Sequence, residues 1–188
     1  MPTLNDDLTY LQSAAESLEQ FLLSDEIYWP LGGRRTAHLP RLSLGGVLLA
    51  SLRAGTYPKT EAQRRRWENL TRDVDAVRTR WRVAWERKAQ REFEARLRQW
   101  KAYLNEYREN PGAQAGYYPY EVRLRVMLDL LAEEIDLGSL PEHISSMYTG
   151  LDALLRAVFV PGDFVWDETL QEGMPKERFW YLYGKLRA

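Results

Sequence analysis

The residues best suited to bind a ligand lie in the segment RRTAHLPRLSLGG, residues 34–46. The candidate ligands there are Arg34, Arg35, His38, Arg41, Gly45 and Gly46. Free N–H groups at a helix N-terminus, together with guanidinium groups, can hold a phosphate or a carboxylate. The spacing is not that of a P-loop, which ends in Gly-Lys-Ser/Thr. The segment therefore has two interpretations: a small-anion or nucleotide site and, favoured, a basic loop whose glycines allow close helix packing.

Other groupings of reactive side chains give little support for catalysis. The chain has no cysteine, its histidines are His38 and His143, and no Ser/His/Asp grouping appears. Asp129, Glu133 and Asp136 share one predicted helix face, but neither histidine stands in the Glu-x-x-His arrangement of bundle metal sites. We interpret these acids as a solvated strip that can meet basic side chains. A non-catalytic protein is favoured over an enzyme, and we expect no metal site and no other cofactor.

A third candidate is an arginine-rich stretch in the middle of the chain. Residues 59–109 carry fifteen Lys and Arg against nine Asp and Glu. On a helical wheel, Arg80, Arg87, Arg91 and Arg98 gather opposite the first stripe of large aromatic residues. The favoured interpretation is a solvated face whose long stems cover apolar neighbours. The alternative is a surface that contacts the phosphates of a nucleic acid.

Hydrophobic periodicity and capping residues predict the elements that would position these side chains. We expect helices from Thr3 to about Ser24, from Ser43 to Gly55, from Thr60 to about 109, over 120–137, from Ser139 to about Val158, and from Pro175 onward. Residues 27–40 and 111–119 are predicted as loops, and no strand-like alternation appears. The expected fold is a single all-α domain, residues 1–188, a bundle of about five to six helices built around one very long central helix.

The predicted central helix is too long for the domain that contains it. Nothing interrupts the chain between the capping box at Thr60 and the sequence Asn110-Pro111-Gly112, which gives a rod of about 73 Å at about 1.5 Å per residue. A domain of this size is roughly 35 to 40 Å across. The helix must therefore bend, break near residues 86–92, where the apolar pattern shifts, or project beyond the domain.

A projecting helix would expose an apolar strip. That strip contains Phe93, Leu97, Trp100, Leu104 and Tyr107. Soluble monomers avoid such surfaces, so we expect the strip to bind a protein partner or a second copy. The leading hypothesis is a non-catalytic helical interaction or scaffold module, a subunit of a homo- or hetero-oligomeric assembly. A nucleic-acid-binding protein that uses the arginines is the alternative, and a small-anion protein or enzyme built on residues 34–46 is the third.

Composition favours a soluble cytoplasmic protein. The formal net charge is −1, and the first residues, MPTLNDD, are acidic and unlike a signal peptide. The longest apolar runs, such as VLLA at 47–50, are too short to cross a bilayer, and we expect no membrane partner.

Overall fold

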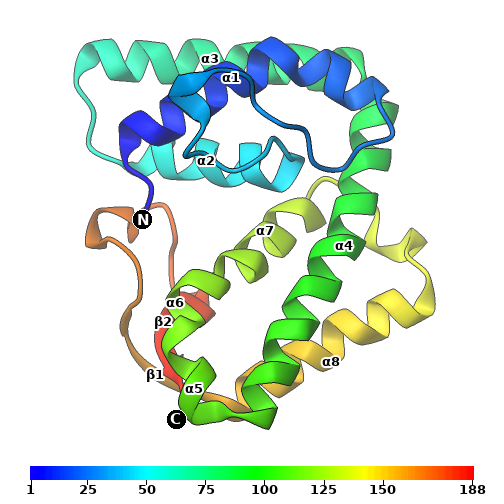
Figure 1. Ribbon diagram of the computed structural model, residues 1–188, viewed down its shortest axis with the longest axis vertical. Helices are drawn as coiled ribbons and strands as arrows, with labels where there is room; N and C mark the ends of the chain where they lie inside the picture. Colours follow the sequence, from blue (N-terminus) through cyan, green and yellow to red (C-terminus); the bar gives the residue numbers. More distant parts are fainter. The chain divides into compact units, whose positions relative to one another are not determined.

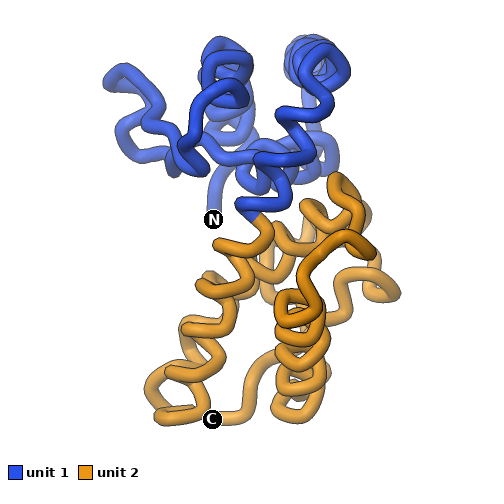
Figure 2. Tube along the Cα trace, turned by 90° about the vertical axis from the view of Figure 1, so that its right-hand side faces the viewer, with its two compact units in different colours: residues 1–92 blue, residues 93–188 orange.

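The computed structural model describes all 188 residues and divides them into two compact units, residues 1–92 and 93–188 (Figure 2). Helices form most of both units, which confirms the all-α class. The only sheet is a pair of short strands in the second unit. Each unit has a hydrophobic core of its own.

The first unit begins with three helices: α1 (Leu4–Leu23), α2 (Leu44–Thr56) and α3 (Glu61–Arg80). Helices α1 and α3 lie side by side, and α2 packs against both (Figure 1). The predicted caps are confirmed, because Thr3 and Thr60 each form a capping box and the Ser43 hydroxyl accepts a hydrogen bond from the Gly46 N–H. These caps fix where the three helices begin.

The single helix predicted for residues 60–109 is confirmed only in part, because the segment is helical but is broken once. It is replaced by α3 and α4 (Arg82–Glu109), with Trp81 between them at φ −113° and ψ 38°. Figure 1 shows a sharp change of direction at this point. The apolar stripe rotates around the helix because steps of four residues exceed the 3.6-residue turn. The break allows Leu70 and Val74 before it, and Trp85 and Ala89 after it, to be buried. It lies at Trp81 and not at residues 86–92.

The second unit is formed by the C-terminal part of α4 and by the elements that follow it. These are α5 (Pro111–Gln114), α6 (Tyr118–Glu121), α7 (Arg123–Ala132), α8 (Glu142–Val158), β1 (Phe159–Phe164) and β2 (Tyr183–Leu186). The segment predicted as a loop at 111–119 therefore contains short helical turns. Seven aromatic side chains of this unit are buried in its core: Phe93, Trp100, Tyr103, Tyr107, Tyr118, Phe179 and Tyr181.

The C-terminal segment corrects two further predictions. No helix starts at Pro175, and β1 and β2 form an antiparallel pair in which Val160 lies opposite Lys185 and Pro161 opposite Gly184. Gly184 has φ 155°, and a Cβ there would collide with the carbonyl oxygen of Val160. Only glycine permits this backbone approach. The apolar residues after Pro175 follow a helical spacing for only one or two turns, which is too short to predict a helix against this strand pairing.

Candidate docking groove on the first unit

The predicted exposed strip on α4 does not form. Phe93, Leu97, Trp100 and Leu104 are fully buried, and Tyr107 is 3% exposed. The Phe93 ring meets Tyr148 edge-on at 5.2 Å, and the Tyr107 hydroxyl donates a hydrogen bond to the carbonyl oxygen of Arg187 at 2.7 Å. Because the chain's own second unit covers these side chains, they are not available to a partner.

The basic loop places its candidate ligands apart from one another. The Gly45 N–H at the start of α2 donates to both carboxylate oxygens of Glu92, at 3.1 Å each, and Glu92 is fully buried. The helix N-terminus therefore already holds an anion from its own chain. Gly46 lies so close to the Tyr10 hydroxyl that a Cβ there would collide with it, as expected for close helix packing.

The remaining basic groups of this loop point to solvent or to α1. Arg34, Arg35 and Arg41 are exposed. The Nε2 atom of His38 lies 3.1 Å from the Asp6 carboxylate, and the Asp6 pKa is lowered mainly by hydrogen bonds from Thr3 and further by His38.

Two buried cations fix the helices of the first unit. The Arg53 guanidinium of α2 makes two hydrogen bonds, 2.6 and 2.9 Å, to the Asp7 carboxylate of α1. Burial raises the pKa of Asp7, and Arg53 opposes that shift. Lys88 of α4 donates to the carbonyl oxygens of Phe21, in the last turn of α1, and of Ser24 and Glu26 just beyond it. These contacts hold α1 against α2 and against the start of α4.

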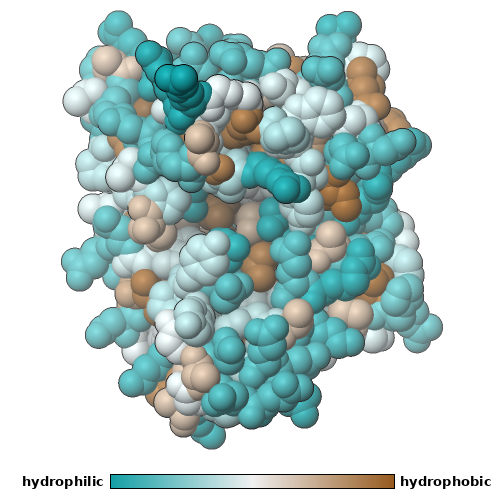
Figure 3. Space-filling model, viewed as in Figure 1, coloured by the Kyte–Doolittle hydropathy of each residue, from teal (hydrophilic) through white to brown (hydrophobic).

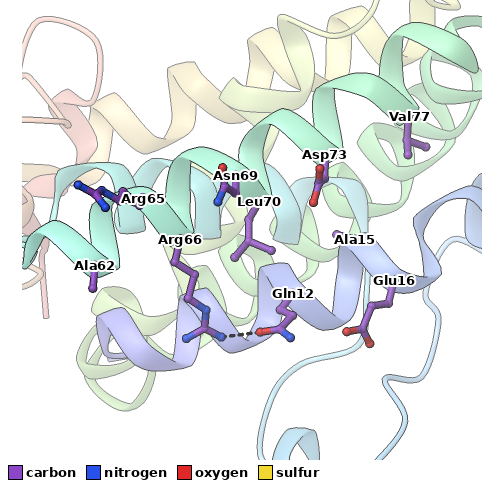
Figure 4. A pocket seen from close by; sticks show the side chains of 10 residues that line it. All are labelled: Gln12, Ala15, Glu16, Ala62, Arg65, Arg66, Asn69, Leu70, Asp73 and Val77. Carbon is purple, nitrogen blue, oxygen red and sulfur yellow. Dashed lines mark hydrogen bonds between the residues drawn. The ribbon is translucent and has the colours of Figure 1, made fainter.

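A groove runs between α1 and α3 with a volume of about 830 Å³ (Figure 4). It is lined by Gln12, Ala15, Glu16, Ala62, Arg65, Arg66, Asn69, Leu70, Asp73 and Val77. The floor is apolar, because Leu70 is buried between the helices and small side chains flank it. Sequence reasoning missed this site. The sequence feature that corresponds to the groove is the spacing of small and polar residues on one face of α3. This spacing indicates a groove only when α1 is known to lie beside that face.

The polar groups of the groove are divided along its length. The Arg66 guanidinium donates to the Gln12 side chain across the groove at 2.7 Å, and Arg65 pairs with Glu61. Further along, Glu16 of α1 and Asp73 of α3 project beside the groove, and neither carboxylate has an ion pair or hydrogen bond within the chain. One end of the groove is basic and the other is acidic.

Few large hydrophobic side chains are exposed elsewhere on the chain. In the face drawn in Figure 3, hydrophilic side chains predominate and hydrophobic ones are scattered. The exposed large hydrophobic residues are Met1, Leu23, Val83, Tyr117, Tyr120 and Leu137. Single exposed apolar side chains are ordinary on soluble proteins. The groove differs from this surface in having an apolar floor with charged side chains at either end.

The four arginines proposed for phosphates are all exposed, with different surroundings. Arg80 lies 3.9 Å from Glu19, a loose pair on the first unit. Arg87 and Arg91 are one turn apart on the first unit and have no acidic partner within ion-pair distance. Arg98 of the second unit also has none.

The second unit contains a buried charged cluster around Arg125. Its guanidinium makes two hydrogen bonds, 2.8 and 3.0 Å, to Asp152 and lies 3.5 Å from Asp129, which accepts a hydrogen bond from the Tyr181 hydroxyl. Of the predicted acidic strip, Asp129 thus belongs to this cluster, while Glu133 pairs with Arg178. Each acid faces a cation or a hydroxyl, which is the arrangement that a buried arginine needs for stability.

No group of three or more His, Asp or Glu side chains is placed to hold a metal ion anywhere in the chain. None of the helices combines the length and the apolar content needed to cross a bilayer. Comparison with protein-family models, with curated proteins and with solved structures finds no match to this chain.

Proposed function

We propose that this chain is a non-catalytic protein-interaction module whose first unit binds a helix of a protein partner in the groove between α1 and α3. The observation that carries the proposal is the groove itself, with its apolar floor and its unpaired Glu16 and Asp73. The strip on α4 no longer supports an interaction role, because the second unit buries it.

The dimensions of the groove suit a helix. Its lining residues on α3 extend from Ala62 to Val77, which is about 22 Å at about 1.5 Å per residue. That length accommodates roughly four turns of a partner helix, whose side chains can pack between those of two neighbouring helices. The small side chains of Ala15 and Ala62 permit close approach of the partner backbone. A helix in this position would complete a four-helix arrangement with α1, α2 and α3.

Site-specific photo-crosslinking in cells tests the proposal. Asn69, which lines the groove, is replaced with p-benzoylphenylalanine, and in a matched variant Asp75, an exposed residue of the same helix outside the groove, is replaced in the same way. We expect irradiation to yield a discrete protein adduct from position 69 and none from position 75. The mass of the adduct and its peptides identify the partner.

The same experiment can refute the interaction role. Adducts that form equally from both positions, or from neither, would show that the groove binds no protein. Circular dichroism of both variants establishes that each retains its helical content, so that a missing adduct cannot be assigned to unfolding.

A second candidate function is supported by the unpaired arginines on α4. Arg87 and Arg91 are exposed, have no acidic partner and stand one turn apart. Guanidinium groups at that spacing can contact neighbouring phosphates without reading bases. Under this alternative the chain binds nucleic acid through Arg80, Arg87, Arg91 and Arg98, with no sequence preference. The test of this alternative is the dependence of DNA affinity on salt concentration.

A further inference from the structure

The groove face of α3 has a charge pattern that is complementary to itself when reversed. The groove-lining residues of α3 are Ala62, Arg65, Arg66, Asn69, Leu70, Asp73 and Val77 (Figure 4). Among them, Ala62, Arg66, Asn69, Asp73 and Val77 follow one another at spacings of four, three, four and four. Arg66 bonds only to the neutral Gln12 side chain, and Asp73 has no partner within the chain. Arg66 and Asp73 are therefore both left without a counter-charge.

From this pattern we infer that the helix bound in the groove is α3 of a second copy of this chain, running antiparallel and related by a two-fold axis near Asn69. The inference rests on the proposed function and names its partner. In a two-fold interface each contact occurs twice with the roles of the copies exchanged. A self-complementary surface is thus what such an interface requires.

The antiparallel register brings opposite charges together. With the axis between Asn69 and Leu70, Arg66 of each copy faces Asp73 of the other, and Ala62 faces Val77 at either end. Glu16 of α1 adds a second carboxylate on the acidic side. A parallel arrangement would place Arg66 against Arg66 and Asp73 against Asp73, which is repulsive.

Asn69 lies where the axis passes. A side-chain amide is both a donor and an acceptor, so two asparagines related by the axis can hydrogen-bond to each other. An asparagine pair at the axis helps to fix the register of the two helices, as a buried asparagine does in coiled coils. The pattern therefore specifies one alignment and disfavours its neighbours.

Charge reversal tests the partner and the register together. The variants Arg66→Glu and Asp73→Arg each place like charges at both symmetry-related contacts. We expect the wild-type chain to form a dimer in sedimentation equilibrium, and each single variant to raise the dissociation constant on the order of tenfold or more. An equimolar mixture of the two variants should dimerise again, because Glu at 66 then faces Arg at 73 and Asp73 faces Arg66.

Asp75→Arg provides the matched control, since it makes the same charge change on the same helix outside the groove. It should leave the dissociation constant unchanged, and circular dichroism should show equal helix content in all variants. A wild-type chain that stays monomeric up to about 1 mM would overturn the inference. Single variants that associate like the wild type, or a mixture that remains monomeric, would overturn it as well.

The failure of this inference is distinguishable from failure of the interaction role. If the chain is monomeric and position 69 crosslinks to a different protein, the groove binds a protein, but that protein is not a second copy of this chain. A monomeric chain with no adduct at position 69 would overturn both.

Discussion

Lys88 shows how a single buried cation can fix the end of a helix. Its side chain is 3% exposed, and Nζ lies 2.6, 2.8 and 2.5 Å from the carbonyl oxygens of Phe21, Ser24 and Glu26. Positive charge at the C-terminal end of a helix is favourable, and the Phe21 carbonyl, which also accepts a hydrogen bond from the Ser24 N–H, belongs to the last turn of α1. Burial nevertheless lowers the pKa of Lys88 to about 8, with a smaller contribution from Arg91 in the same direction and opposition from nearby acids.

A pH titration of lysine side chains by NMR checks this value. With lysine labelled at Cε, we expect the Lys88 resonance to titrate near pH 8. The folded chain releases this proton at a lower pH than the unfolded chain does. Between pH 8 and about 10.5 the contribution of Lys88 to the free energy of unfolding should therefore rise with pH. Lys88→Met should remove both the resonance and this rise, and a resonance that titrates only near 10.5 would contradict the shift.

At the scale of elements, the start of α2 depends on a residue far away in the sequence. Ser43 caps the helix locally, but the Gly45 N–H is bound by Glu92 of α4, forty-seven residues later. A carboxylate there interacts favourably with the positive end of the helix dipole. The contact joins α2 to the start of α4 and removes the N–H group that a free anion would need.

Removing this carboxylate should destabilise the protein. Glu92→Ala leaves the Gly45 N–H buried without an acceptor, and we expect a loss of about 2 to 3 kcal/mol in the free energy of unfolding, measured by urea denaturation. Glu92→Gln should cost less, because its amide oxygen can still accept the hydrogen bond. Equal losses for the two substitutions would indicate that Glu92 contributes packing alone.

At the scale of the whole molecule, charge is divided unevenly between the two units. Residues 1–92 carry fifteen Lys and Arg against twelve Asp and Glu, whereas residues 93–188 carry eleven against fifteen. The small net charge of the whole chain is therefore the sum of a basic first unit and an acidic second unit. Non-specific binding to nucleic acid depends on the local charge and not on the sum.

Under the nucleic-acid alternative, the first unit should bind double-stranded DNA at low salt. Because each arginine on a phosphate displaces about one counterion, the joint change Arg87→Gln and Arg91→Gln should reduce the slope of log affinity against log salt by about two. Arg82→Gln is the control, since Arg82 is already paired with Glu86 at 2.8 Å. An absence of binding at low salt, or an unchanged slope, would exclude the alternative.

Local features of the fold were predictable from the sequence. The capping residues Thr3, Ser43 and Thr60 marked the starts of α1, α2 and α3 correctly, because a cap is made by residues within one turn of each other. The start of α8 was also placed within a few residues. For the groove, the sequence provided the residues of each wall separately but gave no reason to place Gln12 beside Arg66.

Sequence alone thus determined the helical class, the positions of most helix starts and the separation of charged from apolar faces, because these follow from periodicity and local hydrogen bonding. Tertiary structure decided that the chain breaks at Trp81, that Phe93 and Trp100 are buried, and that Gly184 lies in a strand. Each of these depends on contacts between residues distant in the sequence. A helical periodicity shows which side chains share a face, whereas only the folded chain shows what covers that face.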